Sequence, residues 1–207
     1  PPEYTVQGGC AAMTLEGAKS IDVSYAGKQS EKDGERVCGD SVSVTESADG
    51  CFYCFICDGM GSGETAALTS RVCRVFLEKM LACGNDKTTT LEMLNMFLKN
   101  RGAECFATID LLEIDMHTGT ASFIKSGAAP SYIVRGGNLF RIASGTLPVG
   151  ILSDISAEVT EFELEKGDVI VMVSDGICGD PELDSTWLCD YLTKEMTDDL
   201  ALTAEKI

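Results

Sequence analysis

The sequence predicts an α+β protein in which antiparallel sheets carry helices laid on their faces. Two observations favour this class. Most predicted strands succeed one another through short turns rich in glycine, asparagine and aspartate, as the strands of hairpins do. The predicted helices form one pair in the middle of the chain and a further segment near its end, and they do not alternate with the strands. The sheets are therefore expected to be antiparallel.

The first part of the chain is expected to hold short strands. Apolar residues alternate around Tyr4 and Val6, and again at Ile21, Val23 and Tyr25. A polar segment rich in turn residues, 27–36, separates them from the next pair of strands. This pair is predicted at Cys38–Thr45 and Cys51–Cys57, joined by a turn at residues 46–50.

The apolar period changes after Ser62, which predicts a pair of helices. Residues at spacings of three and four mark the first helix, and Gly84 with Asn85 ends it. The recurring positions are Leu68, Val72, Val75, Phe76, Lys79 and Met80. The second helix is predicted over Thr88–Lys99, with Thr89 or Thr90 as its N-cap.

The remainder of the chain returns to strands and ends in a helical pattern. Turn residues at 115–119, 136–138 and 165–167 separate the strands. The predicted strands are 107–116, 120–126, 131–135, 139–143, 159–164 and 168–174, and the predicted helix covers 185–196. The whole chain, residues 1–207, is expected to form one domain, a size that can bury a substantial core.

The charge balance excludes several function classes. Lysine and arginine number 16 against 33 aspartates and glutamates, which gives a formal net charge of −17. Such a surface repels nucleic-acid backbones and anionic membranes. The chain also lacks an apolar run of about 18–20 residues, the length of a membrane helix, and Pro1 does not begin a signal peptide. We therefore expect a cytoplasmic domain, and this leaves open a membrane anchor elsewhere in the parent protein.

Ten cysteines are spread along the chain, and we expect small, buried, reduced thiols. Three of them, Cys51, Cys54 and Cys57, have a spacing that could hold an iron-sulfur cluster or zinc. If this segment is a strand, however, Cys54 points away from the other two, so the three cannot surround one ion. An iron-sulfur or zinc protein therefore remains the less favoured alternative.

Three aspartates lie beside glycines near strand ends. Asp58 comes after a predicted strand and precedes the glycine-rich segment 59–63, Asp175 comes after the strand 168–174, and Asp40 begins the strand before the first of these. A single Asp-Gly pair is often only a turn. Three strand-end carboxylates suit hard divalent ions such as magnesium and manganese, which prefer oxygen ligands.

The same residues carry a resemblance to a known family. The segments GDS, DGMGSGE and MVSDG, in this order, resemble the metal-dependent (PPM) type 2C serine/threonine protein phosphatases, and more closely the phosphatase domain of stage II sporulation protein E. The likeness also includes CFATIDLLEIDM, KSGAAPSYIVRGG, LPVGI and LEKGDVIVMVSDGI, and it covers residues 37–178. DGMGSGE is specific to that branch.

The resemblance implies a four-layer αββα sandwich of two antiparallel sheets flanked by helices. It also implies two divalent cations, Mn²⁺ or Mg²⁺, held by the carboxylates of Asp40, Asp58 and Asp175 and by the carbonyl of Gly59. The family has one more metal-binding aspartate in a last strand, and no such motif occurs before Ile207, because Asp198-Asp199-Leu200 lies in a helical context. We therefore expect a phosphatase domain that lacks the family's last strand.

The function implied is a protein phosphatase that hydrolyses phosphoserine or phosphothreonine on an anti-sigma-factor antagonist of the sporulation type, with a metal-activated water as nucleophile. Arg36 is the candidate contact for the substrate phosphate, with a surface charge as the alternative. The lone histidine, His117, is expected in a solvated turn, and the glycines at 59–63 lack the Lys-Ser or Lys-Thr of a nucleotide-binding loop. A non-catalytic phosphoprotein-binding domain on the same fold is the second hypothesis.

The predicted helix pair leaves directly from the glycine-rich segment 59–63. A shift in its packing would move Asp58 and Gly59, so we hypothesise that it couples metal occupancy to a partner or to self-association as a homodimer. Val72 is taken as a residue of its core-facing side. The alternative is that the helices only cover the sheet.

Overall fold

The computed structural model describes residues 3–7, 10–14, 18–31, 34, 37–101, 105–153, 155, 157–178 and 186–207, with the backbone alone at 3–7, 10–14 and 178. Within these ranges every strand pairs antiparallel with its neighbours, as expected from the hairpin-rich sequence. The larger sheet has the order β3 (Asp40–Glu46), β4 (Cys51–Gly59), β5 (Ala107–Asp115), β6 (Thr120–Ser126), β9 (Val159–Glu163). The smaller sheet has the order β10 (Val169–Val171), β7 (Ser131–Arg135), β8 (Asn138–Ile142), and β1 (Glu3–Gln7) pairs with β2 (Cys10–Thr14).

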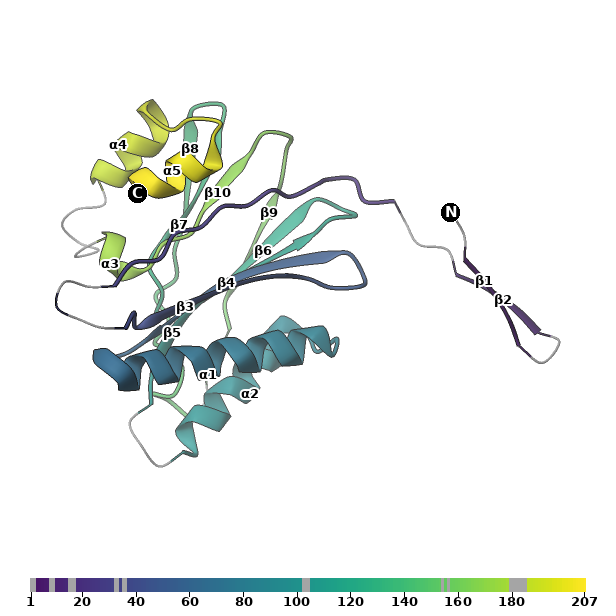
Figure 1. Ribbon diagram of the computed structural model, residues 1–207, viewed down its shortest axis with the longest axis horizontal. Coiled ribbons are helices and arrows are strands. Elements are labelled where there is room, and N and C mark those ends of the chain that lie inside the picture. The colour runs from purple at the N-terminus through teal and green to yellow at the C-terminus, as the bar shows by residue number, and fades with distance from the viewer. Residues whose placement is uncertain are drawn as a thin grey trace.

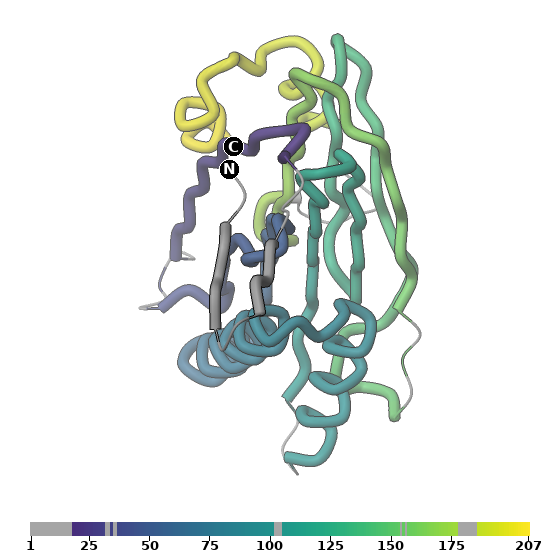
Figure 2. The backbone as a smooth tube through the Cα atoms, turned by 90° about the vertical axis from the view of Figure 1, so that its right-hand side faces the viewer, coloured from purple at the N-terminus to yellow at the C-terminus, as the bar shows by residue number. Residues whose placement is uncertain are grey.

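Helices cover the outer faces of the two sheets. The helices α1 (Gly63–Ala82) and α2 (Lys87–Lys99) lie on the larger sheet, and α4 (Thr186–Lys194) and α5 (Leu200–Lys206) lie on the side of the smaller one. Figure 1 shows the order helix, sheet, sheet, helix from bottom to top, and the tube in Figure 2 keeps this order after a quarter turn. The αββα arrangement predicted from the resemblance is confirmed.

Apolar clusters fill the spaces between these layers. The first joins α1 and α2 to the larger sheet through residues such as Phe55, Leu77 and Leu94. The second lies between the two sheets and includes Phe123 and Ile133, and the third packs α4 on the smaller sheet. Burial of these side chains is the main favourable term that holds the layers together.

One of the strands expected near the larger sheet is absent from the structure. Residues 21–25 do not form a strand, although Ile21 and Val23 pack against the cluster between the sheets. The backbone at this point instead bonds to a turn, because the Ser20 and Ile21 amides both donate to the Met116 carbonyl. The alternation of Ile21 and Val23 therefore reflects their packing against the core, and it does not require that the segment pairs as a strand.

The predicted core face of the first helix is only partly right, because Phe76 packs against the core but others of its residues do not. Leu68 and Val75 are 58% and 44% exposed, and Val72 is only half-buried. The buried residues of α1 are mostly small, and they are Ala66, Ala67, Thr69, Ser70, Cys73, Leu77 and Leu81. The first half of the helix therefore lies close to the sheet through small residues, and Leu77 and Leu81 add larger side chains to the core further along.

Smaller differences concern the ends of elements. The N-cap of α2 is Asp86, whose carboxylate accepts hydrogen bonds from the Thr88 and Thr89 amides, and not Thr89 or Thr90. Asp175 begins a single helical turn, α3 (Asp175–Cys178), after the last strand. The expectation that Asp198-Asp199 lies in a helical context is confirmed, because Asp199 is the N-cap of α5. Across the residues described, no helix is both long and apolar enough to cross a membrane.

Candidate functional site

The β3–β4 hairpin brings the first two aspartates together. Its turn closes through hydrogen bonds of Ser47 with Cys51 and Gly50, and Gly50 has a φ of 84°, which a residue with a side chain rarely adopts. The turn fixes the register of the hairpin, so that Asp40 pairs with Asp58 across the strands. Side chains in such a pair share one face of the sheet and have Cβ atoms about 4.5–5.5 Å apart.

The third aspartate reaches the same place from the other sheet. Asp175 lies beyond the end of β10, and the Ser174 hydroxyl just before it donates a hydrogen bond of 2.7 Å to Asp40 Oδ2. Asp40 and Asp175 are both close enough to the Asp58 carboxyl to raise its pKa. The three aspartates predicted from the sequence therefore lie near one another at one end of the sandwich, although Asp175 is more than a hundred residues from the other two along the chain.

The electrostatics of this cluster are unfavourable without a cation. Burial, together with the neighbouring Asp40 and Asp175, raises the pKa of Asp58 to about 7. The negative charges beside Asp58 make it harder for that carboxyl to ionise. A raised carboxyl pKa at clustered acids is typical of a functional site.

Gly59 adds a backbone oxygen beside the carboxylates. The Gly59 carbonyl oxygen and Asp58 Oδ1 both lie 3.9 Å from the point where a Cβ of Gly39 would stand, so they border the same space. Gly59 itself is required by close packing, because its own Cβ would lie 2.0 Å from the Ala66 carbonyl oxygen. The position of Gly59 therefore has a structural reason besides any contact with a ligand.

These oxygens suit a hard divalent ion in kind. Within the described ranges, however, no group of three or more His, Cys, Asp or Glu side chains is spaced as a ready-made metal site. If an ion binds here, its ligands would be the carboxylates of Asp40, Asp58 and Asp175, the Gly59 carbonyl and water molecules. Magnesium and manganese commonly use such oxygen ligands.

The remaining candidates lie elsewhere. Arg36 is outside the described residues. His117 lies in the turn after β5, half-buried, with its ring nitrogens 3.3 Å and 3.2 Å from the carbonyls of Ala18 and Asp49. Its turn position is as predicted, but it is less exposed than expected.

The cysteines of β4 alternate between faces as the strand prediction requires. Cys57 belongs to the cluster beneath the helices and Cys51 packs against it, whereas Cys54 packs against the cluster between the sheets. Burial raises the pKa of Cys54 to about 12 and raises that of Cys57 well above its ordinary value. The cysteines whose side chains are described are free thiols, so the sulfur-bound metal is not supported there.

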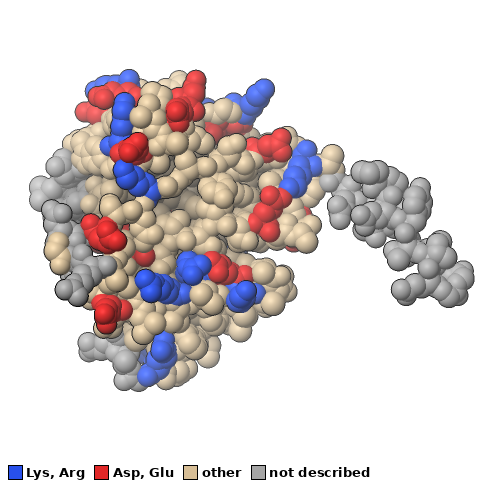
Figure 3. Space-filling model, viewed as in Figure 1, with Lys and Arg blue, Asp and Glu red and all other residues tan. Residues whose placement is uncertain are grey.

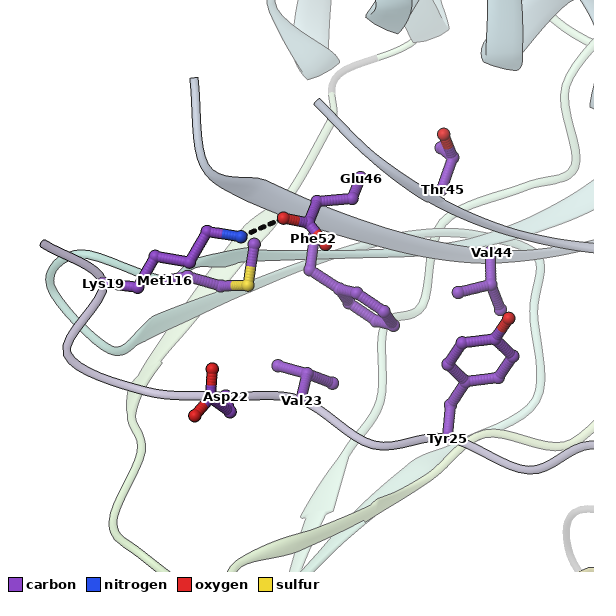
Figure 4. A pocket seen from close by; sticks show the side chains of 9 residues that line it. All are labelled: Lys19, Asp22, Val23, Tyr25, Val44, Thr45, Glu46, Phe52 and Met116. Carbon is purple, nitrogen blue, oxygen red and sulfur yellow. Dashed lines mark hydrogen bonds and ion pairs between the residues drawn. The ribbon is translucent and has the colours of Figure 1, made fainter. Parts of the chain in front are cut away.

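Hollows lie beside both ends of β3. One, of about 290 Å³, lies beside Glu46 between β3, Phe52 and the segment carrying Lys19 and Tyr25, as the side chains in Figure 4 show. Six residue steps of about 3.3 Å separate Glu46 from Asp40, so this hollow is about 20 Å from the aspartates. The other, of about 450 Å³, includes Asp40 in its lining.

Sequence reasoning missed some residues around the site. Ser174 lies in the MVSDG segment but had no predicted role, and its hydrogen bond to Asp40 depends on the approach of two sheets that the sequence pattern does not reveal. Arg71 and Arg74 of α1 line the larger hollow beside Asp40. The only signal for them was their spacing of three residues, which places them on one side of a helix.

Comparisons with known proteins agree with the fold. The model of the stage II sporulation protein E (SpoIIE) family matches residues 48–207. Stage II sporulation protein E of Bacillus subtilis (strain 168) is 34% identical over 175 residues, which cover 84% of this chain and 21% of that protein. The phosphoserine phosphatase RsbU of the same organism is 26% identical and covers 59% of this chain and 37% of that protein. The chain thus spans about a fifth of the length of the first relative.

Two solved structures have the same fold. The PP2C phosphatase domain of B. subtilis SpoIIE, solved with a fragment of its regulatory domain, superposes with a TM-score of 0.84 at 29% identity, covering 99% of this chain and 63% of that one. RsbX in complex with magnesium superposes with a TM-score of 0.69 at 22% identity, covering 86% of this chain and 84% of that one. The second likeness concerns the fold alone.

Proposed function

The chain belongs to the stage II sporulation protein E family, and from this premise we propose that it is a metal-dependent phosphatase acting on phosphoserine or phosphothreonine of a regulatory protein. The observation that carries the proposal is the meeting of Asp40, Asp58 and Asp175 at one end of the sandwich. The name of RsbU, a phosphoserine phosphatase, supports the class of substrate. An anti-sigma-factor antagonist is the substrate that the resemblance favours.

The donor set supports two divalent cations, Mn²⁺ or Mg²⁺, as cofactors. Asp40, Asp58, Asp175 and the Gly59 carbonyl would hold them, and the magnesium found with RsbX is consistent with this choice. Such ions lower the pKa of bound water and neutralise phosphoryl oxygens. On the protein side, Ser174 orients the Asp40 carboxylate through its hydrogen bond, and burial holds Asp58 in place between its neighbours.

Cys54, Cys57 and His117 are poorly suited to act as nucleophiles. The thiols of Cys54 and Cys57 have raised pKa values and remain protonated near neutral pH. The His117 ring is engaged with backbone carbonyls at a turn outside the aspartate cluster. Attack by water therefore accounts for hydrolysis better than a phosphorylated enzyme intermediate does.

Hydrolysis of a phosphoserine protein, measured against Mn²⁺ concentration, tests the proposal. We expect Mn²⁺-dependent turnover by the wild-type chain and a loss of about a hundredfold or more in Asp58→Asn and in Asp175→Asn. Asp49→Asn, which removes an exposed carboxylate in the β3–β4 turn, is the matched control and should keep its activity. Full activity in both site variants would refute the proposal. Binding of the phosphoprotein with no turnover by the wild type would favour a non-catalytic phosphoprotein-binding domain.

A further inference from the structure

The larger hollow has Asp40 in its lining and reaches the side of α1. It has a volume of about 450 Å³, and its walls come from the start of β3, from residues 29–31 and from α1. The segment 29–31 is tied to β3, because the Gln29 side-chain amide donates a hydrogen bond of 2.7 Å to the Asp40 carbonyl. A peptide segment lying in this hollow would therefore pass directly beside Asp40.

Two arginines of α1, Arg71 and Arg74, give one wall of the hollow a positive charge. They are three residues apart and so lie on one side of the helix. The Arg74 guanidinium is held by Glu78 at 2.5 Å, and the Ser43 hydroxyl of β3 donates to the same Glu78 oxygen at 2.7 Å. This arrangement fixes Arg74 between the helix and the sheet edge.

Arg71 differs from Arg74 in its surroundings. Its side chain is exposed, and it makes neither a hydrogen bond nor an ion pair with the part of the chain that the structure describes. Its guanidinium is therefore free to pair with an anion at the hollow that it lines. A guanidinium binds a carboxylate through two parallel hydrogen bonds, which a lysine cannot match.

The arginine-lined wall of the hollow differs in charge from the rest of the protein. The chain carries a formal charge of −17, and Asp40 and Glu31 add acidic groups to the same hollow. In the face seen in Figure 3, basic side chains gather along the helix at the bottom of the molecule, next to acidic ones. A local positive group in an acidic protein attracts anionic segments toward it.

We propose that Arg71 and Arg74 form a subsite for acidic residues that flank the phosphoserine of the substrate. The inference rests on the proposed phosphatase function and names the kind of sequence that it prefers. The phosphate, with a charge of about −1.5 to −2, lies at the aspartate cluster, and aspartate or glutamate a few residues away pairs with the arginines. The helix α1 thus selects substrates, besides covering the sheet.

Binding of two matched peptides tests this subsite. Both carry a hydrolysis-resistant phosphonate analogue of phosphoserine and a fluorescent label; one has aspartates and glutamates on both sides, and the other has asparagines and glutamines in their place. Fluorescence anisotropy in the presence of Mn²⁺ gives the Kd of each. Because several flanking carboxylates can pair with the arginines at once, the acidic peptide should bind the wild type about tenfold tighter.

The variant Arg71→Glu should bring the two Kd values to within about threefold of each other, since the pairing is replaced by repulsion. Lys79→Glu is the matched control, because it makes the same charge change at an exposed position of the same helix, two turns away, and should keep the preference. Melting temperatures verify that both variants are folded.

Equal binding of both peptides by the wild type, binding of neither, or the same loss of preference in both variants would overturn the subsite. Turnover of p-nitrophenyl phosphate, which is too small to occupy the hollow, reports separately on the proposed function. If the wild type does not hydrolyse p-nitrophenyl phosphate but still prefers the acidic peptide, the phosphatase proposal is refuted and the subsite is retained. If the wild type hydrolyses p-nitrophenyl phosphate but binds both peptides equally, only the subsite is refuted.

Discussion

Asp58 is the residue on which the site depends most. It pairs with Asp40 across the hairpin and meets Asp175 from the other sheet, and burial together with these neighbours raises its pKa to about 7. A carboxyl with a raised pKa among other acids is in an environment with too much negative charge. A protein keeps such an arrangement when a cation or a proton relieves it, which is the physical reason for placing a metal there.

A second buried charge lies between the sheets. Lys125 and Asp110 form an ion pair of 2.6 Å whose side chains are each 2% exposed. The Lys125 ammonium also donates to the Ala129 carbonyl and to the Ser131 hydroxyl, and that hydroxyl donates to Asp110. Burial raises the pKa of the Asp110 carboxyl, although Lys125 and Ser131 oppose the rise. The pair ties the larger sheet to the start of β7 in the smaller one.

Removal of one partner of this pair should destabilise the fold strongly. Lys125→Met leaves the Asp110 charge buried without compensation, which costs about 3–5 kcal/mol. The double variant Lys125→Met/Asp110→Leu should recover most of that loss, because a buried pair can often be replaced by apolar side chains. Urea unfolding followed by circular dichroism measures both.

The same substitution at an exposed pair provides the control. Lys194 pairs with Asp190 on α4, with side chains 69% and 66% exposed, so Lys194→Met should change the free energy of unfolding by less than about 1 kcal/mol. An equal effect of the two lysine substitutions would show that the buried pair has no special role in stability.

At the residue scale, the sequence marks some candidates by their neighbours, and the role of those candidates as metal ligands stays a prediction. Asp40, Asp58 and Asp175 stand beside glycines at strand ends, and the structure brings them together. The Lys125–Asp110 pair was missed, since a lysine and an aspartate inside strands resemble ordinary exposed charges until the second sheet is placed over them.

At the scale of elements, the contact of α1 with β4 positions the site. The helix begins four residues after Gly59 and lies so close to the strand that a side chain at Gly59 would overlap the Ala66 backbone. Its buried face uses Ala66, Ala67 and Ser70 for the same reason. The hypothesis that the helix pair transmits a partner's binding to Asp58 remains a prediction, and this contact is the route it requires.

The variant Gly59→Ala tests that close approach. Its methyl group would force the first turns of α1 away from β4, and overpacking of this kind costs about 1–3 kcal/mol. For a domain of this size the melting temperature should fall by about 2–12 °C. Gly145→Ala is the matched control, because that glycine is exposed and a Cβ there would meet no atom within 4 Å. Equal melting temperatures for the two variants would contradict the close packing.

The sequence predicts the order of the helices and strands more accurately than it predicts which side of each is buried. The hairpins and both central helices are present close to their predicted bounds. The buried side of α1 was only partly predicted, because the start of the helix packs on the sheet through small residues such as Ala66 and Ala67, whereas Leu68 is exposed. The strand at 21–25 was wrong because alternation reports burial, and strand pairing requires a neighbour with free backbone groups.

At the scale of the whole molecule, the two-sheet sandwich explains how distant parts of the chain form one site. The larger sheet supplies Asp40 and Asp58, the smaller one leads to Ser174 and Asp175, and the sheets meet at this end through the Ser174–Asp40 hydrogen bond. The layers could be predicted only through the family resemblance, because hairpin spacing gives antiparallel sheets but not how they stack. The expected homodimer stays a prediction.

Direct Mn²⁺ binding tests the central claim, the convergence of three carboxylates on a divalent ion. Electron paramagnetic resonance of free Mn²⁺ during titration gives the affinity without any need for turnover. The account predicts saturable binding by the wild type, a loss of about tenfold or more in Asp58→Asn and in Asp175→Asn, and no change in Asp49→Asn. Equal Mn²⁺ affinity in all four proteins would contradict it.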